Sequence, residues 1–183
     1  AVKKKGSVPF FGPLFCLTAR EAFGMLNGSR MTDGGGLHYM ASMIVRNPTP
    51  GEVDAAAEVA SKAFPDGPLR EWQREFHLRA DVFGLRYILV VEHEGQIVSS
   101  LICTPAPVWV NGRLVSHSAV GGVGTLPEFR CKGLAGLMMT ECVRLLREEG
   151  ICLSSLWPFS YEYYRKFGWE VGCEHRSYSA SSE

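Results

Sequence analysis

The chain is predicted to fold as one α/β (α+β) domain, a mixed central sheet with helices on both faces. Three observations predict this class. Strand-like and helix-like segments alternate over residues 43–183, turn dipeptides join the early strands as hairpins, and a long amphipathic helix separates two late apolar runs as a parallel crossover does. At 183 residues the chain is long enough to bury one core, and it contains no repeat or low-complexity run.

Residues 1–42 differ from the rest and are interpreted as an extension. Their basic start and short apolar run look like a secretory signal, but prolines and a glycine interrupt the run, which is too short to span a bilayer. Turn-forming residues dominate from Asn27 to Ser42. We therefore expect residues 43–183 to be the folded domain and residues 1–42 to be an added or upstream-translated segment, which packs on the body or on a neighbouring chain.

The domain begins with a short strand over Met43–Arg46, followed by a helix with marked ends. Thr49 is placed to cap the helix and Glu52 stands three positions later, which is the capping-box pattern. Apolar residues recur on one face from Val53 to Phe64, and the run PDGP then stops the helix. A second helix is expected over Leu69–Asp81, with few apolar residues among its charges.

Turn dipeptides divide the next region into strands. The runs YILVVE and QIVSSLICT flank Glu94-Gly95, and a second hairpin is expected at Asn111-Gly112. The strand that follows runs from about Leu114 to Leu126 and contains Gly121-Gly122-Val123-Gly124. Glycines inside a strand indicate either a bulge or the close approach of a ligand to the backbone, and this segment alone favours neither.

The last third predicts a helix, a strand, a short helix and a final strand. Apolar residues form a stripe along the helix from about Gly133 to Glu149, and Gly150 ends it. ICLSSLW is typical of a buried strand. Ser160 is placed to cap the short helix SYEYYRKF, which ends at Gly168 before the last strand begins.

Charge and cysteine usage exclude several classes of function. Nineteen basic residues balance nineteen acidic ones, so the net field favours neither nucleic acid nor an anionic membrane. The six cysteines include no C-x-x-C pair, and no histidine cluster has metal-ligand spacing, so we expect no metal site. Scattered single cysteines are typical of a reducing compartment, which favours a cytoplasmic location.

The turn R-C-K-G-L-A at Arg130–Ala135 is the first candidate for chemistry. Unpaired N–H groups and the dipole of a helix start attract anions, phosphate above all, and Arg130 and Lys132 add full charges. The same residues are also compatible with a plain surface turn. Neither a Walker loop nor G-x-G-x-x-G is present, which argues against a nucleotide-binding domain.

The aromatic helix with Tyr161, Tyr163 and Tyr164 is a second candidate. Aromatic residues at helical spacing are more often part of a core than catalytic. A tyrosine hydroxyl can nevertheless donate a proton to a leaving group of similar pKa, and a thiolate is such a group.

In order and spacing these motifs resemble the GNAT superfamily of acetyl-CoA-dependent N-acetyltransferases. The resemblance rests on VGTLPEFRCKGLAGLMMTECVRLLREEG followed by ICLSSLWPFSYEYYRKFGWEV, and it extends from Met43 to the C-terminus. The segment LWPFSYEYYRKFGWE is most similar to the N-terminal domain of the enhanced-intracellular-survival (Eis) type.

The resemblance implies direct attack of a primary amine on acetyl-CoA between two splayed strands, with Tyr164 as the general acid and a backbone N–H holding the oxyanion. The backbone of Val123, Gly124 and Thr125 would pair with the pantetheine arm. The pyrophosphate cradle would be formed by Arg130, Cys131, Lys132, Gly133, Leu134, Ala135 and Gly136, and Phe159 and Ser160 would lie beside the thioester.

The general base and the acceptor are less well defined by the resemblance. Eis-type proteins continue into further domains whose terminal carboxylate is the base, whereas this chain stops at Glu183. Water, His117 or Glu128 would then take the proton, or the domain is a non-catalytic CoA-binding module. Acidic residues in the early helical region suit a cationic amine and favour a small polyamine-like or aminoglycoside-like acceptor over a protein lysine; they are Asp66, Glu71, Glu75 and Asp81. An ordered extension would support a homo-oligomer such as a dimer.

Overall fold

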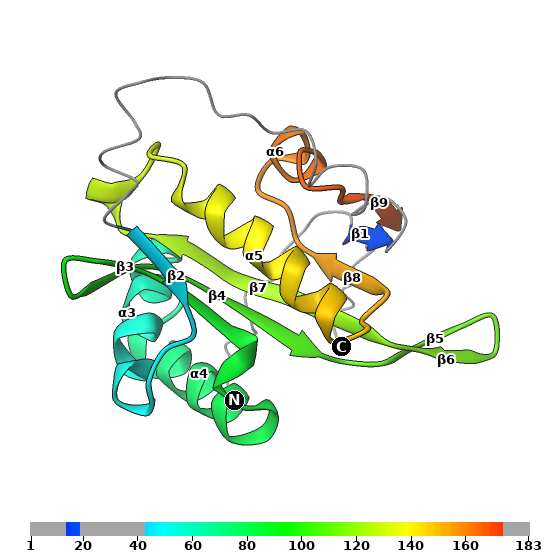
Figure 1. The fold of residues 1–183 in the computed structure, drawn as a ribbon, viewed down its shortest axis with the longest axis horizontal. Helices are drawn as coiled ribbons and strands as arrows, with labels where there is room; N and C mark the ends of the chain where they lie inside the picture. Colours follow the sequence, from blue (N-terminus) through cyan, green and yellow to red (C-terminus); the bar gives the residue numbers. More distant parts are fainter. Residues whose placement is uncertain (1–13, 19–42, 174–183) are drawn as a thin grey trace, which may run out of the picture.

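The computed structural model describes residues 14–18 and 43–173 (Figure 1). Within them, seven strands form one mixed sheet in the order β2-β3-β4-β7-β8-β1-β9, and two further strands form a separate ribbon. The sheet strands are β1 (Leu14–Thr18), β2 (Met43–Arg46), β3 (Ile88–His93), β4 (Gln96–Pro105), β7 (His117–Thr125), β8 (Leu153–Leu156) and β9 (Glu170–Cys173), and the ribbon is β5 (Val108–Val110) with β6 (Arg113–Val115).

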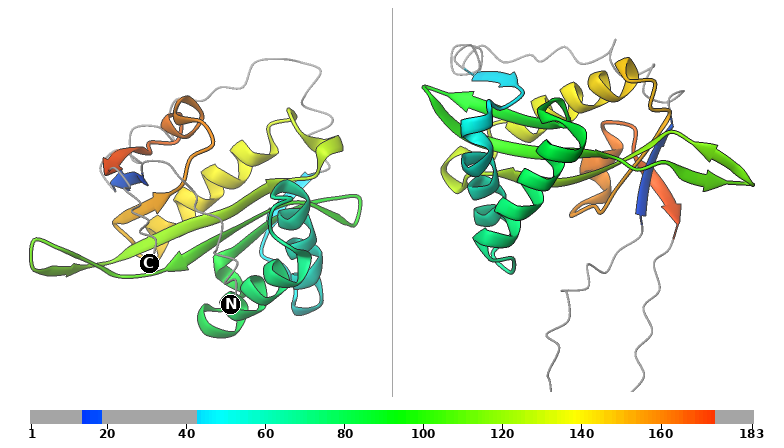
Figure 2. Two further views of the ribbon diagram at one scale, coloured as in Figure 1. Left: turned by 180° about the vertical axis from the view of Figure 1, so that it is seen from behind. Right: turned by 90° about the horizontal axis from the view of Figure 1, so that it is seen from below.

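Helices cover both faces of the sheet, which confirms the predicted fold class (Figures 1 and 2). Helices α3 and α4 lie on one face, and α5 and α6 lie on the other. The helices are α3 (Val53–Ala63), α4 (Leu69–Phe83), α5 (Leu134–Glu148) and α6 (Tyr161–Arg165), with 3-10 turns η1 (Pro50–Glu52), η2 (Leu85–Tyr87) and η3 (Pro127–Phe129). None of the described helices is long and apolar enough to cross a membrane.

Both predicted hairpins are present, and both use two-residue turns with left-handed backbone. Glu94 and Gly95 have φ of 51° and 80°, and Asn111 and Gly112 have φ of 49° and 74°. Positive φ at both central positions matches the twist of the flanking strands, so these dipeptides set the strand register. The strand expected to begin near Leu114 is interrupted, because β6 ends in the projecting ribbon before β7 starts (Figure 1).

The start of α3 is fixed by a capping box, as the sequence predicts, and also by an arginine. The Thr49 backbone N–H donates to Glu52 Oε2 at 2.7 Å. The Arg46 guanidinium contacts Glu52 at 2.6 Å and Glu92 on β3 at 2.7 Å. The hydrogen bonds from Arg46 hold the pKa of Glu52 at about 2, below its ordinary value of 4.5. This pairing joins the start of α3 to the edge of the sheet.

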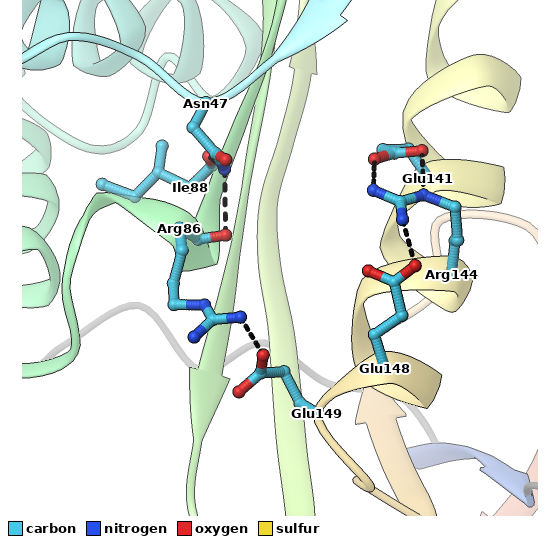
Figure 3. A network of polar contacts seen from close by, with 7 residues as sticks. All are labelled: Asn47, Arg86, Ile88, Glu141, Arg144, Glu148 and Glu149. Atoms are coloured by element: carbon cyan, nitrogen blue, oxygen red, sulfur yellow. Dashed lines mark hydrogen bonds and ion pairs between the residues drawn. The ribbon is translucent and has the colours of Figure 1, made fainter.

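Helix α5 crosses from β7 to the parallel strand β8 and supplies much of one core layer. Its buried residues are Leu134, Met138, Met139, Cys142, Val143, Leu145 and Leu146. Its carboxyl end is tied to the turn before β3, because Glu149 accepts a hydrogen bond from Arg86 and one from the Tyr87 hydroxyl at 2.8 Å. Figure 3 shows the contact between Arg86 and Glu149, together with Asn47 Nδ2, which donates to the Arg86 and Ile88 carbonyls at 2.9 and 2.8 Å.

Strand β1 comes from the predicted extension and lies inside the sheet. It pairs antiparallel with β8, Phe15 opposite Leu156, and on its other side with β9. Among the described strands, β9 therefore joins the sheet only through β1. The remainder of residues 1–42 lies outside the described residues, and the expected domain boundary at Met43 stays a prediction.

Candidate active site

Strands β7 and β8 separate part of the way along the sheet. They pair in parallel over only four positions, from His117 opposite Leu153 to Val120 opposite Leu156. Beyond Val120, β7 continues to Thr125 with no described strand on that side, while the chain leaves β8 and enters the segment before α6. The sheet therefore has a wedge-shaped opening between the last residues of these two strands.

A cavity of about 160 Å³ lies in this opening. Its wall combines the end of β7, the segment after β8, helix α6 and residues from the α3–α4 side. The lining residues are Phe64, Trp72, Val120, Gly121, Gly122, Val123, Leu156, Trp157, Phe159 and Tyr164. Half of them are aromatic, and none carries a carboxylate, an ammonium or an imidazole. Phe64, Trp72 and Trp157 were not among the predicted site residues.

A β-bulge shapes the β7 side of the cavity. Ser100 lies opposite Gly124 and Ile102 opposite Gly121, so Gly122 and Val123 together face a single residue of β4. Gly122 has a φ of 60°, the left-handed conformation that this type of bulge requires. The glycine-rich run thus forms a bulge that borders a cavity, and the approach of a ligand to its backbone stays a prediction.

Gly124 has a packing role of its own. A Cβ at this position would lie 2.9 Å from Ala63 Cβ and 3.3 Å from the Val59 carbonyl oxygen. Only a residue without a side chain lets α3 approach β7 this closely. The Gly124 carbonyl also accepts a 2.6 Å hydrogen bond from Ser99 Oγ. Of the residues expected to pair with pantetheine, Val123 lies on the cavity wall and Gly124 lies just beyond it.

Thr125 ends β7 and is joined to the turn that follows. Its carbonyl accepts a hydrogen bond from Arg130 Nε at 3.2 Å, and its hydroxyl lies 2.7 Å from Ser99 Oγ. Lys132 Nζ lies 5.1 Å from the centre of the Phe129 ring. Both basic side chains of the predicted anion-binding turn at Arg130–Ala135, called the anion turn below, are thus held next to the start of α5.

The first turn of α5 offers backbone donors. The first helical hydrogen bond runs from the Leu137 N–H to the Gly133 carbonyl at 3.1 Å, so the preceding N–H groups have no acceptor inside the helix. No described side chain caps this end, and no acidic residue lies in the first turn. Cys131 and Gly133 have φ of 59° and 81°, which turns the chain sharply before the helix. The exposed turn therefore presents N–H groups and two cations, a combination suited to an anion.

Tyr164 lies on the cavity wall in an aromatic cluster. Its ring centre is 5.3 Å from both Phe159 and Tyr163. Burial raises its pKa above the ordinary range, and the neighbouring Tyr163 adds to the shift. No hydrogen bond within the described residues engages its hydroxyl. At neutral pH Tyr164 is therefore a protonated donor beside the opening between β7 and β8.

Phe159 and Ser160, expected together beside a ligand, differ in position. Phe159 lines the cavity and is 72% exposed. Ser160 does not line it, and its hydroxyl instead accepts the Tyr163 backbone N–H at 3.3 Å, which confirms the predicted cap of α6.

Neither side chain named as a possible base reaches the cavity wall. His117 is buried on the paired part of β7, with Nδ1 2.8 Å from the Ala106 carbonyl and Nε2 2.7 Å from Ser155 Oγ. Because both ring nitrogens are engaged, His117 is a packed structural residue. Glu128 is exposed in η3. The acidic residues of the second helical region do not line the cavity either; they are Asp66, Glu71, Glu75 and Asp81.

Comparison with solved structures supports the fold. A probable N-acyltransferase from Enterococcus faecalis V583 is 26% identical with a TM-score of 0.59, over 68% of this chain and 31% of that chain. A GNAT family acetyltransferase from Brucella melitensis, in complex with acetyl-CoA, is 22% identical with a TM-score of 0.57, over 77% of this chain and 91% of that one. Eis1 from Mycobacterium abscessus is 21% identical with a TM-score of 0.57, over 68% and 30%.

The chain spans about a third of the length of the first of these structures, at 31%. The comparison with curated proteins gave no match. The family model described as an acetyltransferase (GNAT) domain matches residues 44–172, which is most of the chain and includes the wedge, the turn before α5 and the aromatic helix. The chain therefore belongs to the GNAT acetyltransferase family.

Proposed function

We propose that this domain is an acetyl-CoA-dependent N-acetyltransferase that moves an acetyl group to a primary amine by direct attack. The observation that carries the proposal is the separation of β7 and β8, which opens a cavity between a bulged strand and the Tyr164 hydroxyl. Acetyl-CoA, the co-substrate of the family, supplies the acetyl group as a thioester. The residues of the site fit such a ligand, because an anion turn and an unpaired strand edge both border the wedge.

In this proposal each part of the site has one task. The first turn of α5 binds the pyrophosphate through its backbone N–H groups, with Arg130 and Lys132 supplying charge. The free edge of β7 from Val123 to Thr125 pairs with the amide-bearing arm as an added strand does. A backbone N–H of the bulged strand donates to the carbonyl oxygen as it gains negative charge, which is the arrangement of an oxyanion hole.

Tyr164 protonates the leaving sulfur in the last stage of the reaction. As the new N–C bond forms and the C–S bond breaks, its hydroxyl donates a proton to the sulfur and is then reprotonated from solvent. Burial raises the pKa of Tyr164, which keeps its hydroxyl protonated throughout the neutral range but also makes it a weaker acid than an exposed tyrosine. Because a thiol has an ordinary pKa of about 8.5, the departing sulfur carries negative charge before it is protonated. The hydrogen bond from Tyr164 also stabilises this charge.

The attacking amine must lose a proton, and no described carboxylate or imidazole lines the cavity to accept it. An apolar wall lowers the pKa of a bound amine, because burial disfavours the ammonium form. We therefore propose that water takes this proton. The same observation favours a second candidate function, a module that binds CoA without turnover.

Calorimetric titration with acetyl-CoA, followed by an assay of thiol release with an amine panel, tests the proposal. We expect micromolar binding and amine-dependent release of CoA. Binding without release on any amine would favour the non-catalytic module, and no binding at all would refute both functions.

The closer relation to the Eis type is part of the proposal and is supported by the segment LWPFSYEYYRKFGWE and by the shared fold with Eis1. The cytoplasmic location and the homo-oligomeric state stay predictions.

A further inference from the structure

The cavity between β7 and β8 has walls on both faces of the sheet. Tyr164 comes from α6, on the same face as α5 and its anion turn, whereas Phe64 and Trp72 come from the α3–α4 side (Figures 1 and 2). A ligand anchored at the start of α5 enters the wedge from the α5 face. The wall made by Phe64 and Trp72 therefore faces the other reactant, the amine acceptor.

That acceptor wall is made of two stacked aromatic rings. The rings of Phe64 and Trp72 stack with their centres 5.3 Å apart and their planes 29° apart. The Trp72 indole lies close to two glycines, since a Cβ on Gly67 would lie 2.7 Å from Nε1 and a Cβ on Gly122 would lie 3.5 Å from Cζ3, so a side chain at Gly67 would collide with the ring. Trp72 thus lies between the α3–α4 loop and the β7 bulge.

The size of the cavity limits the acceptor to one ring. Its volume is about 160 Å³. A dry cavity of roughly 150 Å³ lined by aliphatic and aromatic side chains is known to hold a single benzene molecule. The acceptor shares this opening with the thioester, which Val123, Phe159 and Tyr164 border, so at most one six-membered ring fits there with its amine directed at the thioester, and a polyamine built of several rings is too large.

The charges around the cavity do not suit a polycation. A buried ammonium is costly unless a carboxylate pairs with it, and no described carboxylate lines the wall. Glu75 is already paired with Arg79 at 2.6 Å on α4. Asp66 and Glu71 are exposed away from the lining. The wall therefore favours the binding of an apolar group. Additional positive charges on the acceptor would have no carboxylate partner among the described lining residues.

From these observations we infer that the acceptor is a primary amine carried on a single aromatic or similarly apolar ring, with Phe64 and Trp72 as the residues that select it. This inference rests on the proposed N-acetyltransferase function. It replaces the polyamine-like or aminoglycoside-like acceptor that the acidic helical residues favour in the sequence.

The experiment compares three amines with acetyl-CoA: 2-phenylethylamine, ethylamine and spermidine. We expect kcat/KM for 2-phenylethylamine to exceed that for ethylamine by about 10- to 100-fold, the gain from burying one ring, and spermidine to be the poorest. The variant Phe64→Ala should reduce the phenylethylamine-to-ethylamine ratio about tenfold. Phe64→Leu replaces it if the alanine variant does not fold.

Glu71→Gln is the matched control, since Glu71 is exposed on α4 outside the cavity. It should leave the ratio unchanged. Saturation-transfer NMR of 2-phenylethylamine in the presence of CoA measures binding directly and gives a readout that does not depend on turnover.

The outcomes separate the inference from the function on which it rests. Equal rates for the three amines, a preference for spermidine that Glu71→Gln weakens, or a preference for longer acyl-CoA donors with no selection among amines would overturn the inference and leave the transferase intact. Binding of 2-phenylethylamine without acetylation of any amine would refute the proposed function and support the ring pocket. Neither binding nor acetylation would refute both.

Discussion

Placing a single methyl group at Gly124 should destabilise the domain measurably. In Gly124→Ala the new Cβ would lie 2.9 Å from Ala63 Cβ and 3.3 Å from the Val59 carbonyl oxygen. Carbon atoms pack at about 3.5–4.0 Å, so α3 must move away from β7 by several tenths of an ångström. Both opposing groups are fixed to the helix backbone, and no side-chain rotation relieves the contact.

Overpacking of this kind costs about 1–3 kcal/mol. For a chain of this size each kcal/mol lowers the melting temperature by about 2–4 °C. Urea denaturation followed by circular dichroism should therefore show a lower midpoint for Gly124→Ala with an unchanged slope.

The chain supplies both a control and a rescue. Gly121 lies on the same strand, where an added Cβ would have no atom within 4 Å and φ is not left-handed, so Gly121→Ala should be close to neutral. Ala63→Gly removes the nearest opposing carbon and should cost under about 1 kcal/mol on its own at the end of α3. The double variant should recover about 1 kcal/mol of the loss relative to additivity. If Gly124→Ala were as stable as Gly121→Ala, or if Ala63→Gly gave no rescue, the close approach of α3 and β7 would be wrong.

Three further changes test the site and the start of α3. Tyr164→Phe should lower kcat by about 10²- to 10⁴-fold, with the dissociation constant of acetyl-CoA little changed; unaltered turnover would remove Tyr164 from the mechanism. Gly133→Asp should weaken acetyl-CoA binding in calorimetry at least about tenfold by adding an anion at the phosphate turn, whereas Gly133→Asn, of equal size and equally tolerant of a left-handed φ, should bind more tightly than the aspartate variant. The pKa of Glu52 is lowered to about 2, so the stability from its pairing with Arg46 is present above pH 4.5 and is lost as the pH falls towards 2. Acid denaturation should show a loss of about 1–2 kcal/mol there, and Arg46→Met should abolish that part of the pH dependence.

Local chemistry accounts for what the sequence predicted well. The hairpins at Glu94-Gly95 and Asn111-Gly112, the capping box and the Ser160 cap each depend on a few adjacent residues, so their geometry follows from short motifs. The opening between β7 and β8 and the place of Tyr164 beside it are predicted only through the family resemblance, because a family pattern carries information about contacts between distant segments of the chain.

The acceptor wall and the inserted strand could not be predicted in this way. Phe64, Trp72 and Trp157 meet only because α3, α4 and β8 pack around the same opening, and nothing in their local sequence distinguishes them from ordinary core aromatics. The short run LFCLT likewise has no neighbour in sequence that marks it as a strand between β8 and β9. Contacts between distant segments decide both features.

The position of β1 has a consequence for how the domain folds as it is synthesised. Its five residues leave the ribosome before every other described element, yet their partners in β8 and β9 follow more than 130 residues later. The pairings among β3, β4 and β7 require neither β8 nor β9, because all three strands precede β8 in the chain. The partners of β1 are therefore absent while the earlier helices and hairpins emerge, and its insertion between β8 and β9 must follow the synthesis of both strands.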